Sequence, residues 1–196
     1  MATEKASTRT RIMKAAVEII GKEGNLGATV REIAEKAGVN IAAINYHFSS
    51  KEKLIEEVER VAMEQVTLIY DSLLDGRGSL RERLMRWADK LMSYLIDYPG
   101  IIYMLGAKVL QGENKGAGME DYLSISDVRL KPVVEELTGI SDEKMLSFKA
   151  LQLISGVVYP ALIYSGAKKA FGKIISSERA RREYLASLID SLVRPG

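Results

Sequence analysis

The chain of 196 residues contains no cysteine and a single histidine, His47. Without cysteine it can form no disulfide, no thiol nucleophile and no thiolate metal site. A lone histidine without cysteine partners is a poor basis for a metal site. We therefore expect neither a metal ion nor a cofactor.

Long apolar runs are missing as well. No uninterrupted apolar run reaches the roughly 18 residues that are needed to span a bilayer. The first residues, MATEKASTRTR, lack the apolar core of a signal peptide. These absences predict a cytoplasmic protein with no membrane partner.

The common catalytic motifs are also absent. The chain has no G-x-S-x-G elbow, no G-x-x-x-x-G-K-[ST] loop, no G-x-G-x-x-G after a strand and no H-E-x-x-H pair. Adjacent carboxylates such as Glu56 and Glu57 diverge by about 100° on a helix, which is typical of a solvated face. We therefore expect no enzyme activity.

The composition that remains is typical of a soluble globular protein, with 47% hydrophobic and 28% charged residues. Its net charge of +2 is unevenly distributed, because residues 1–53 hold nine Lys and Arg against six Asp and Glu. This modest positive excess suits attraction to phosphate. Apolar residues recur at helical spacing and no strand-like alternation is present, so the pattern predicts an all-α fold.

The most informative stretch is TVREIAEKAGVNIAAINYHFSSK, residues 29–51. Thr29 and Glu32 have the T-x-x-E spacing of a capping box, which predicts a helix start at Val30. Gly38 can adopt the left-handed backbone conformation that ends a helix. The pattern therefore predicts a short helix, a tight turn and then a second short helix.

The second helix places Ile41, Ile44 and Phe48 at i, i+3 and i+7, on one face. The other positions carry small, amide, aromatic and imidazole side chains instead of a charged solvation face. A helix with such a surface can enter the major groove, about 12 Å wide, and reach base edges. The stretch therefore favours DNA recognition by a helix-turn-helix unit.

A further helix is predicted to begin immediately after this unit. Ser49 and Glu52 show a second S-x-x-E spacing, which favours a capped helix start. The free amides and the positive dipole end of that helix, with Lys51 beside them, predict a phosphate-binding position.

Three motifs together resemble those of the TetR (tetracycline-repressor-like) family of transcriptional regulators, over about residues 8–61. They are A-x-x-I-I-G-x-x-G from Ala16, TVREIAEKAGV from Thr29 and YHFSSKEKL from Tyr46. The resemblance implies base or groove contacts from Arg31, Ile41, Ala42, Asn45 and Tyr46, and phosphate contacts from Thr29, His47 and Lys51.

The chain departs from the family pattern at two of these positions. Many members have glycine at the position of Ala42, and tyrosine at the position of Asn45. The operator sequence therefore cannot be transferred. Alternatives also stay open for three side chains, since Tyr46 can pack inside the unit, Arg31 can be a solvated helix charge and His47 an ordinary polar residue.

The remaining pattern predicts two domains joined by a long helix from Ser50 to about Leu74. We place a helix-turn-helix domain at residues 1–53, with the recognition unit at 29–48, and a helical ligand-sensing and dimerisation domain at 54–196. Later in the chain, Pro132 is expected to bend or split one helix and Pro160 to kink another.

The last two helices carry apolar stripes that favour a homodimer, because helix-turn-helix proteins usually bind paired half-sites through a two-fold axis. The resemblance implies the same interface. The predicted interface residues are Val157, Ala161, Tyr184, Leu185, Leu188 and Leu192. The alternative is that these stripes belong to the chain's own core.

The middle of the chain, residues 79–164, is rich in aromatic and methionine side chains, which can line an adaptable pocket for a small organic effector. The predicted lining residues are Trp87, Tyr94, Tyr103, Tyr122, Phe148 and Gln152. For each of them, the alternative is ordinary packing in the core.

The functional hypothesis is a DNA-binding transcriptional regulator, acting as a repressor that a small organic effector releases from a palindromic operator. Two alternatives remain open. One is a helical binding or scaffolding protein that has lost DNA binding, and the other is an all-helical enzyme.

Overall fold

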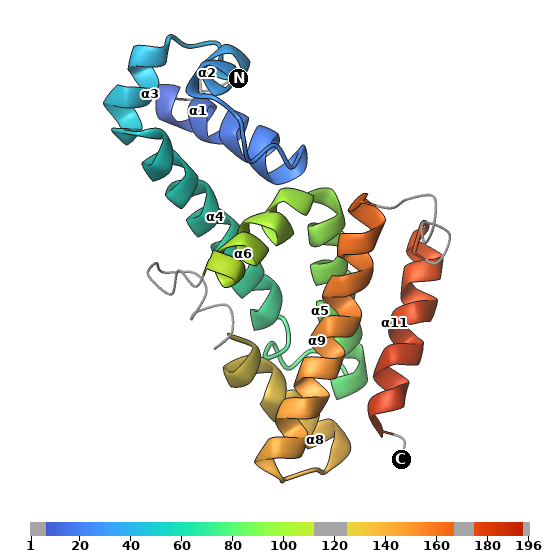
Figure 1. The fold of residues 1–196 in the computed structure, drawn as a ribbon. Coiled ribbons are helices and arrows are strands. Elements are labelled where there is room, and N and C mark those ends of the chain that lie inside the picture. Colours follow the sequence, from blue (N-terminus) through green and yellow to red (C-terminus); the bar gives the residue numbers. More distant parts are fainter. Residues whose placement is uncertain (1–6, 112–124, 167–174, 194–196) are drawn as a thin grey trace, which may run out of the picture. The chain divides into compact units, whose positions relative to one another are not determined.

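The computed structural model describes residues 7–111, 125–166 and 175–193. Every regular element in these residues is a helix (Figure 1). The predicted all-α fold with an N-terminal three-helix unit is therefore confirmed. In chain order the elements are α1 (Thr8–Ala16), η1 (Val17–Lys22), α2 (Val30–Ala37), α3 (Ile41–Phe48), α4 (Lys51–Asp71), α5 (Leu80–Asp97), α6 (Pro99–Gln111), η2 (Ser126–Leu130), α8 (Lys131–Thr138), α9 (Glu143–Gly166) and α11 (Glu178–Val193).

The described residues divide into two compact units. Unit 1 contains residues 7–62 and 98–111, and unit 2 contains residues 63–97, 125–166 and 175–193. The division differs from the predicted boundary at 53/54, since it falls inside α4 and returns α6 to the first unit. Helix α4 therefore contributes residues to both units.

Unit 1 is built on three short helices, α1, α2 and α3, which contact one another. Their apolar faces meet in a core whose largest fully buried side chains are Ile12, Ile20, Ile33, Ile44 and Leu54. The capping box predicted at the start of α2 is confirmed, because Thr29 Oγ1 accepts from the Glu32 N–H at 3.2 Å and Glu32 Oε2 accepts from the Thr29 N–H at 2.6 Å.

The second predicted capping box, at Ser49 and Glu52, is wrong by one residue. Ser50 is the capping residue, and its Oγ accepts from the Lys53 N–H at 3.2 Å. Ser49 instead has a positive φ of 67° and ends α3. The helix nevertheless starts at Lys51, so the prediction that this lysine lies in its first turn is confirmed.

The helix that begins as α1 continues to Lys22, and its last segment, η1, is π-helical. The Glu23 N–H donates to the Glu18 carbonyl at 2.9 Å, which is the i→i+5 pattern of a π-helix. Such segments are rare and widen the helix locally.

Helix α6 contacts η1 through Gly100, inside unit 1. A Cβ atom added at Gly100 would lie 1.8 Å from the Ile20 carbonyl oxygen. Only glycine allows this approach of two backbones. Pro99 and Gly100 are the first two residues of α6.

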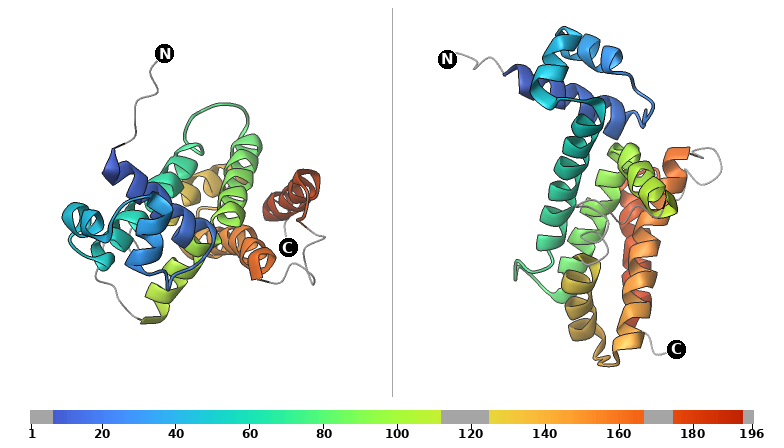
Figure 2. Two further views of the ribbon diagram at one scale, coloured as in Figure 1. Left: turned by 90° about the horizontal axis from the view of Figure 1, so that it is seen from above. Right: turned by 60° about the vertical axis from the view of Figure 1, so that its left-hand side comes forward.

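Unit 2 is a bundle in which α5, α9 and α11 contact one another in pairs and α8 packs against α5 and α9 (Figure 2). A capping box starts α5, since the Ser79 N–H donates to Glu82 Oε2 at 2.7 Å and Ser79 Oγ accepts from the Glu82 N–H at 3.3 Å. Pro132 lies at the start of α8, directly after the π-helical η2, so the helix changes type at this point. Pro160 lies inside α9, which continues to Gly166.

Helix α9 is apolar on most of its surface. By length and composition alone, residues 143–164 are long and apolar enough to cross a membrane, and 28% of that window is buried in the chain. Core helices of soluble proteins pass the same test. The helix contacts α5, α8 and α11, which cover one side of it. Much of its apolar surface is therefore left uncovered by the residues that the structure describes.

Candidate nucleic-acid interface

The turn between α2 and α3 is held by backbone and side-chain hydrogen bonds from three elements. Gly38 has a φ of 63°, and the following Val39 N–H donates to the Ala34 carbonyl at 3.0 Å, which closes the C-terminus of α2. From α1, the Arg11 guanidinium donates to the carbonyls of Ala37 at 2.7 Å and Gly38 at 2.6 Å. The turn is therefore fixed from behind by α1.

Helix α3 begins at a cap that we did not predict. Asn40 Oδ1 accepts from the Ala43 N–H at 2.8 Å. Asparagine is among the preferred N-cap residues, so its position before Ile41 was a signal available in the sequence. No local pattern reveals Arg11, because its partners lie 26 and 27 residues away.

The two faces of α3 differ sharply. Ile44 and Phe48 are buried, as predicted, whereas Ile41 is 45% exposed and does not belong to the buried face. Ala42 and Asn45 are exposed, and Tyr46 is 85% exposed. The structure thus gathers four of the predicted contact residues on the free surface of one short helix.

His47 is half-buried and lies next to the Tyr46 ring, with the two ring centroids 5.0 Å apart and nearly perpendicular. Arg31 is exposed on α2. Thr29 lies at the start of α2, where its hydroxyl also donates to Glu32 at 2.8 Å and is therefore engaged in the capping box. The DNA contacts of these residues stay predictions.

The Thr29 cap also affects the ionisation of its partner. The backbone N–H of Thr29 is the main cause that lowers the pKa of the exposed Glu32 carboxyl, followed by the Thr29 hydroxyl. The ionised carboxylate is therefore favoured in the folded chain. Its stabilising effect is present above the ordinary pKa and is lost as the pH falls through the lowered value.

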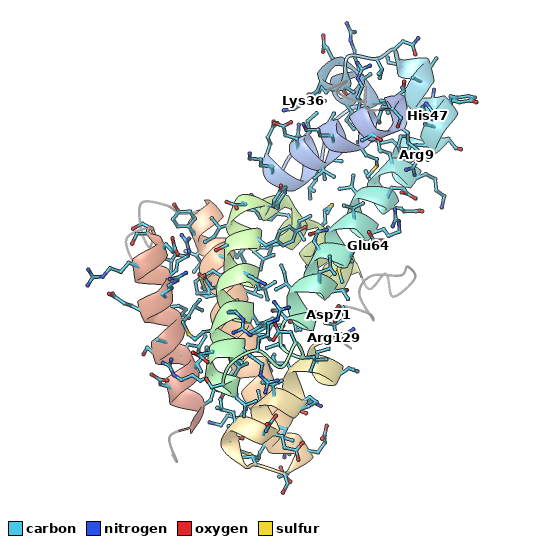
Figure 3. All side chains as sticks on the ribbon, turned by 180° about the vertical axis from the view of Figure 1, so that it is seen from behind. Arg9, Lys36, His47, Glu64, Asp71 and Arg129 are labelled. Carbon is cyan, nitrogen blue, oxygen red and sulfur yellow. The ribbon has the colours of Figure 1, made fainter. Side chains whose placement is uncertain are left out.

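Arg9 connects three helices of unit 1 close to the end of α3. Its guanidinium lies 5.0 Å from the centroid of the Phe48 ring and donates to Glu57 Oε2 of α4 at 3.0 Å. Glu57 also accepts from Arg60 at 3.0 Å, and this bond is the main cause of the lowered pKa of Glu57. Figure 3 shows Arg9 and His47 in this part of unit 1.

Lys51, which is half-buried, is the first residue of α4. The Lys53 N–H of the same turn donates to Ser50 Oγ, and the positive end of the helix dipole at this point favours an anion beside Lys51. The arrangement suits a phosphate group.

The predicted effector-binding residues occupy different environments. Trp87 is fully buried and packs against Tyr70, with ring centroids 5.3 Å apart. Tyr94 is half-buried, whereas Phe148 and Gln152 are exposed on α9. Tyr103 is 40% exposed in unit 1. Tyr122 lies outside the described residues, and the pocket role of all six stays a prediction.

The structure corrects the predicted dimer interface at four positions. Val157, Ala161, Leu185 and Leu192 are buried in the core of the single chain, so they have no surface to offer a second copy. They follow the alternative interpretation, in which the stripes pack within the chain.

The other two predicted interface residues pack on α9 of the same chain. The Tyr184 hydroxyl donates to the Gly156 carbonyl at 2.7 Å. A Cβ atom at Gly156 would lie 2.7 Å from a methyl carbon of Leu188. Because Gly156 has no side chain, Leu188 of α11 can approach α9 closely at this point.

Comparison with known proteins agrees with this geometry. The model of the family described as "Bacterial regulatory proteins, tetR family" matches residues 12–58, which include the whole turn and the start of α4. The fold matches a TetR transcriptional regulator of known structure from Legionella pneumophila, with a TM-score of 0.71 and 21% identity over 98% of this chain and 100% of that chain. Residues 12–58 therefore match the tetR family, and the chain shares the fold of that regulator.

Two curated relatives match over part of the chain. The nucleoid occlusion factor SlmA of Marinobacter nauticus is 29% identical over 115 residues, which are 59% of this chain and 59% of that protein. The HTH-type transcriptional repressor KstR2 of Mycolicibacterium smegmatis is 33% identical over 82 residues, 42% of this chain and 40% of that protein. The chain thus matches these relatives over about half of their length.

Proposed function

We propose that this protein is a tetR-family DNA-binding transcriptional regulator, a repressor that a small organic effector releases from a palindromic operator. The observation that carries the proposal is the free surface of α3. Asn45 and Tyr46 are exposed on a helix whose opposite face is buried and whose preceding turn is held by Arg11. An exposed amide and phenol on a rigid helix are suited to base edges in the major groove.

The proposed phosphate contacts come from residues of the same unit. We assign Lys51 and the first turn of α4 to one phosphate, and Thr29, Arg31 and His47 to positions along the backbone beside it. Ile41 and Ala42, at the start of α3, are suited to apolar contact in the groove. This division separates residues that position the protein from residues that read sequence.

Replacing Lys51 with alanine should weaken binding to all DNA sequences by a similar factor. Loss of one phosphate contact removes about 0.9 from the slope of log K against log salt. A salt titration of DNA affinity, monitored by fluorescence anisotropy, measures that slope. The control is Lys90→Ala, an exposed lysine on α5, which should leave the slope unchanged.

The proposed dimer uses the exposed side of α9. Met145, Phe148, Gln152, Ser155 and Tyr159 are exposed and alternate at spacings of three and four, the spacing of a seam between packed helices. We call these five residues the α9 seam. A second copy of the chain is the occupant that a palindromic operator requires, because its half-sites are related by a two-fold axis.

The double substitution Phe148→Lys with Tyr159→Lys should convert the dimer to a monomer, because it places charges on both copies of an apolar seam. Light scattering after gel filtration should give twice the chain mass of 21.7 kDa for the unmodified protein and that mass for the variant. The control is Leu68→Lys on α4, where the leucine is 61% exposed. A dimer that survives the double substitution would exclude the α9 seam.

The proposed effector site lies in unit 2, near Trp87. Its indole Nε1 is buried and has no hydrogen-bond partner in the described chain, and the same holds for Nε of Arg83, one turn earlier on α5. Buried donors are nearly always paired. An effector with an acceptor oxygen would satisfy them, which supports Trp87 as a lining residue.

The signal would reach the DNA-binding unit along α4. Its C-terminal residue, Asp71, pairs with Arg129 of η2 at 2.9 Å (Figure 3), and its N-terminal residue is Lys51. An effector shifts the balance between a DNA-binding state and a released state only if it binds these two states unequally.

We also propose a cytoplasmic location and no catalytic activity. Neither of the two alternative functions is favoured by a specific observation.

A further inference from the structure

Unit 1 contains a cavity of about 490 Å³ between α1, η1, α4 and Tyr98. Its apolar wall is formed by Met13, Val17, Val61 and the ring of Tyr98. Ligand pockets in proteins commonly have volumes of about 300–1,000 Å³ and mostly apolar linings with a few polar groups. The size and the wall therefore suit a small organic molecule.

The charged side of the cavity has an excess of cations. Arg9 and Arg60 both lie on it, and Glu57 is their shared ion-pair partner at 3.0 Å from each. One carboxylate thus faces two guanidinium groups.

Two lysines add to this excess. Lys14 and Lys22 also line the cavity, and neither has an ion-pair partner in the part of the chain that the structure describes. Glu18, the other carboxylate of the lining, lies 3.5 Å from the Lys36 ammonium, outside the lining. The cavity therefore offers cations to an anion without removing them from existing pairs.

The π-helical segment η1 forms part of this lining. Val17, Glu18 and Lys22, at the two ends of η1, all line the cavity. Well under 1% of residues in proteins are π-helical, and single π-turns occur frequently at functional sites. This backbone feature points to the same place as the charge excess, but it is independent of the side-chain charges.

We propose that this cavity binds a small amphipathic organic anion, with its hydrocarbon part against Met13, Val17, Val61 and Tyr98 and its carboxylate beside Lys14 and Lys22. All the lining residues belong to unit 1, so the site is separate from the effector site proposed near Trp87. Because Arg9 also contacts the Phe48 ring at the end of α3, the bound anion lies next to a side chain that supports the recognition helix.

Octanoate is the probe, and the full-length protein labelled with ¹³C at its methionine methyl groups is the sample. Octanoate should shift the Met13 resonance, which a Met13→Leu variant identifies. Neutral 1-octanol, which has the same tail without the charge, should bind roughly three- to tenfold more weakly, since each of the two exposed ion pairs adds roughly 0.2–1 kcal/mol.

Two variants locate the site. Lys14→Gln with Lys22→Gln should weaken octanoate binding roughly three- to tenfold, whereas the matched control Lys53→Gln with Lys90→Gln should not. Val17→Phe should reduce the Met13 shift by filling the wall. If the Val17→Phe variant does not fold, the comparison of octanoate affinity between the two lysine double variants still tests the proposal. The proposal would be overturned if octanoate leaves the Met13 resonance unshifted, or if 1-octanol binds as tightly as octanoate. It would also be overturned if both lysine double variants bind octanoate with equal affinity.

Discussion

Replacing Tyr46 with alanine should lower affinity for the specific operator roughly ten- to hundredfold, because each lost base contact costs about 1–3 kcal/mol. Affinity for unrelated DNA should change much less, since that binding depends on phosphate contacts. The fold should be unaffected, because the Tyr46 ring is 85% exposed.

Parallel titrations with operator and unrelated DNA measure this effect, and circular dichroism checks the helical content. Tyr103→Ala is the matched control, since it removes another exposed tyrosine ring from unit 1. If affinity for both DNAs falls by the same factor, Tyr46 contacts only the backbone. If neither falls, α3 does not read bases through this residue.

Gly100→Ala should destabilise the protein by about 3 kcal/mol, at the upper end of ordinary overpacking, because the new methyl group would overlap a backbone oxygen that cannot move away alone. The added Cβ would lie 1.8 Å from the Ile20 carbonyl oxygen. Alanine's better helix propensity, about 1 kcal/mol, does not offset this cost. The melting temperature should fall by about 6–12 °C.

The control is Gly106→Ala on the same helix, where an added Cβ meets nothing within 4 Å. That variant should be neutral or slightly more stable, because only the propensity term remains. Differential scanning calorimetry of the two variants separates the effects. If the Gly100→Ala variant has the same melting temperature as the unmodified protein, α6 does not approach η1 as described.

Local signals explain what the sequence could predict. The box at Thr29 with Glu32 involves side chains three residues apart, so its spacing alone identified the start of α2. The same rule failed at Ser49, because a second serine follows it and the sequence pattern cannot choose between them.

Contacts between distant residues were beyond the sequence. Arg11 supports the turn through carbonyls 26 and 27 residues away, and η1 is π-helical next to the close approach of Gly100. Neither feature leaves a periodic signal. Both had to come from the structure.

The apolar stripes show a third kind of limit. Helical periodicity identifies which residues share a face, but it does not say whether the chain or a second copy covers that face. Val157 and Leu185 are covered by the chain itself. Phe148, which we expected in a pocket, is 46% exposed on α9, and periodicity alone does not say what covers it.

The most direct test of the central claim is a competition assay between genomic fragments and bulk DNA at modest ionic strength. The purified protein should select at least one fragment, with an affinity about 10³-fold or more above that for the bulk competitor. Fragments flanking its own gene are the first to test. If every fragment is displaced by bulk DNA as easily as any other, the exposed surface of α3 does not read sequence and the regulator proposal is contradicted.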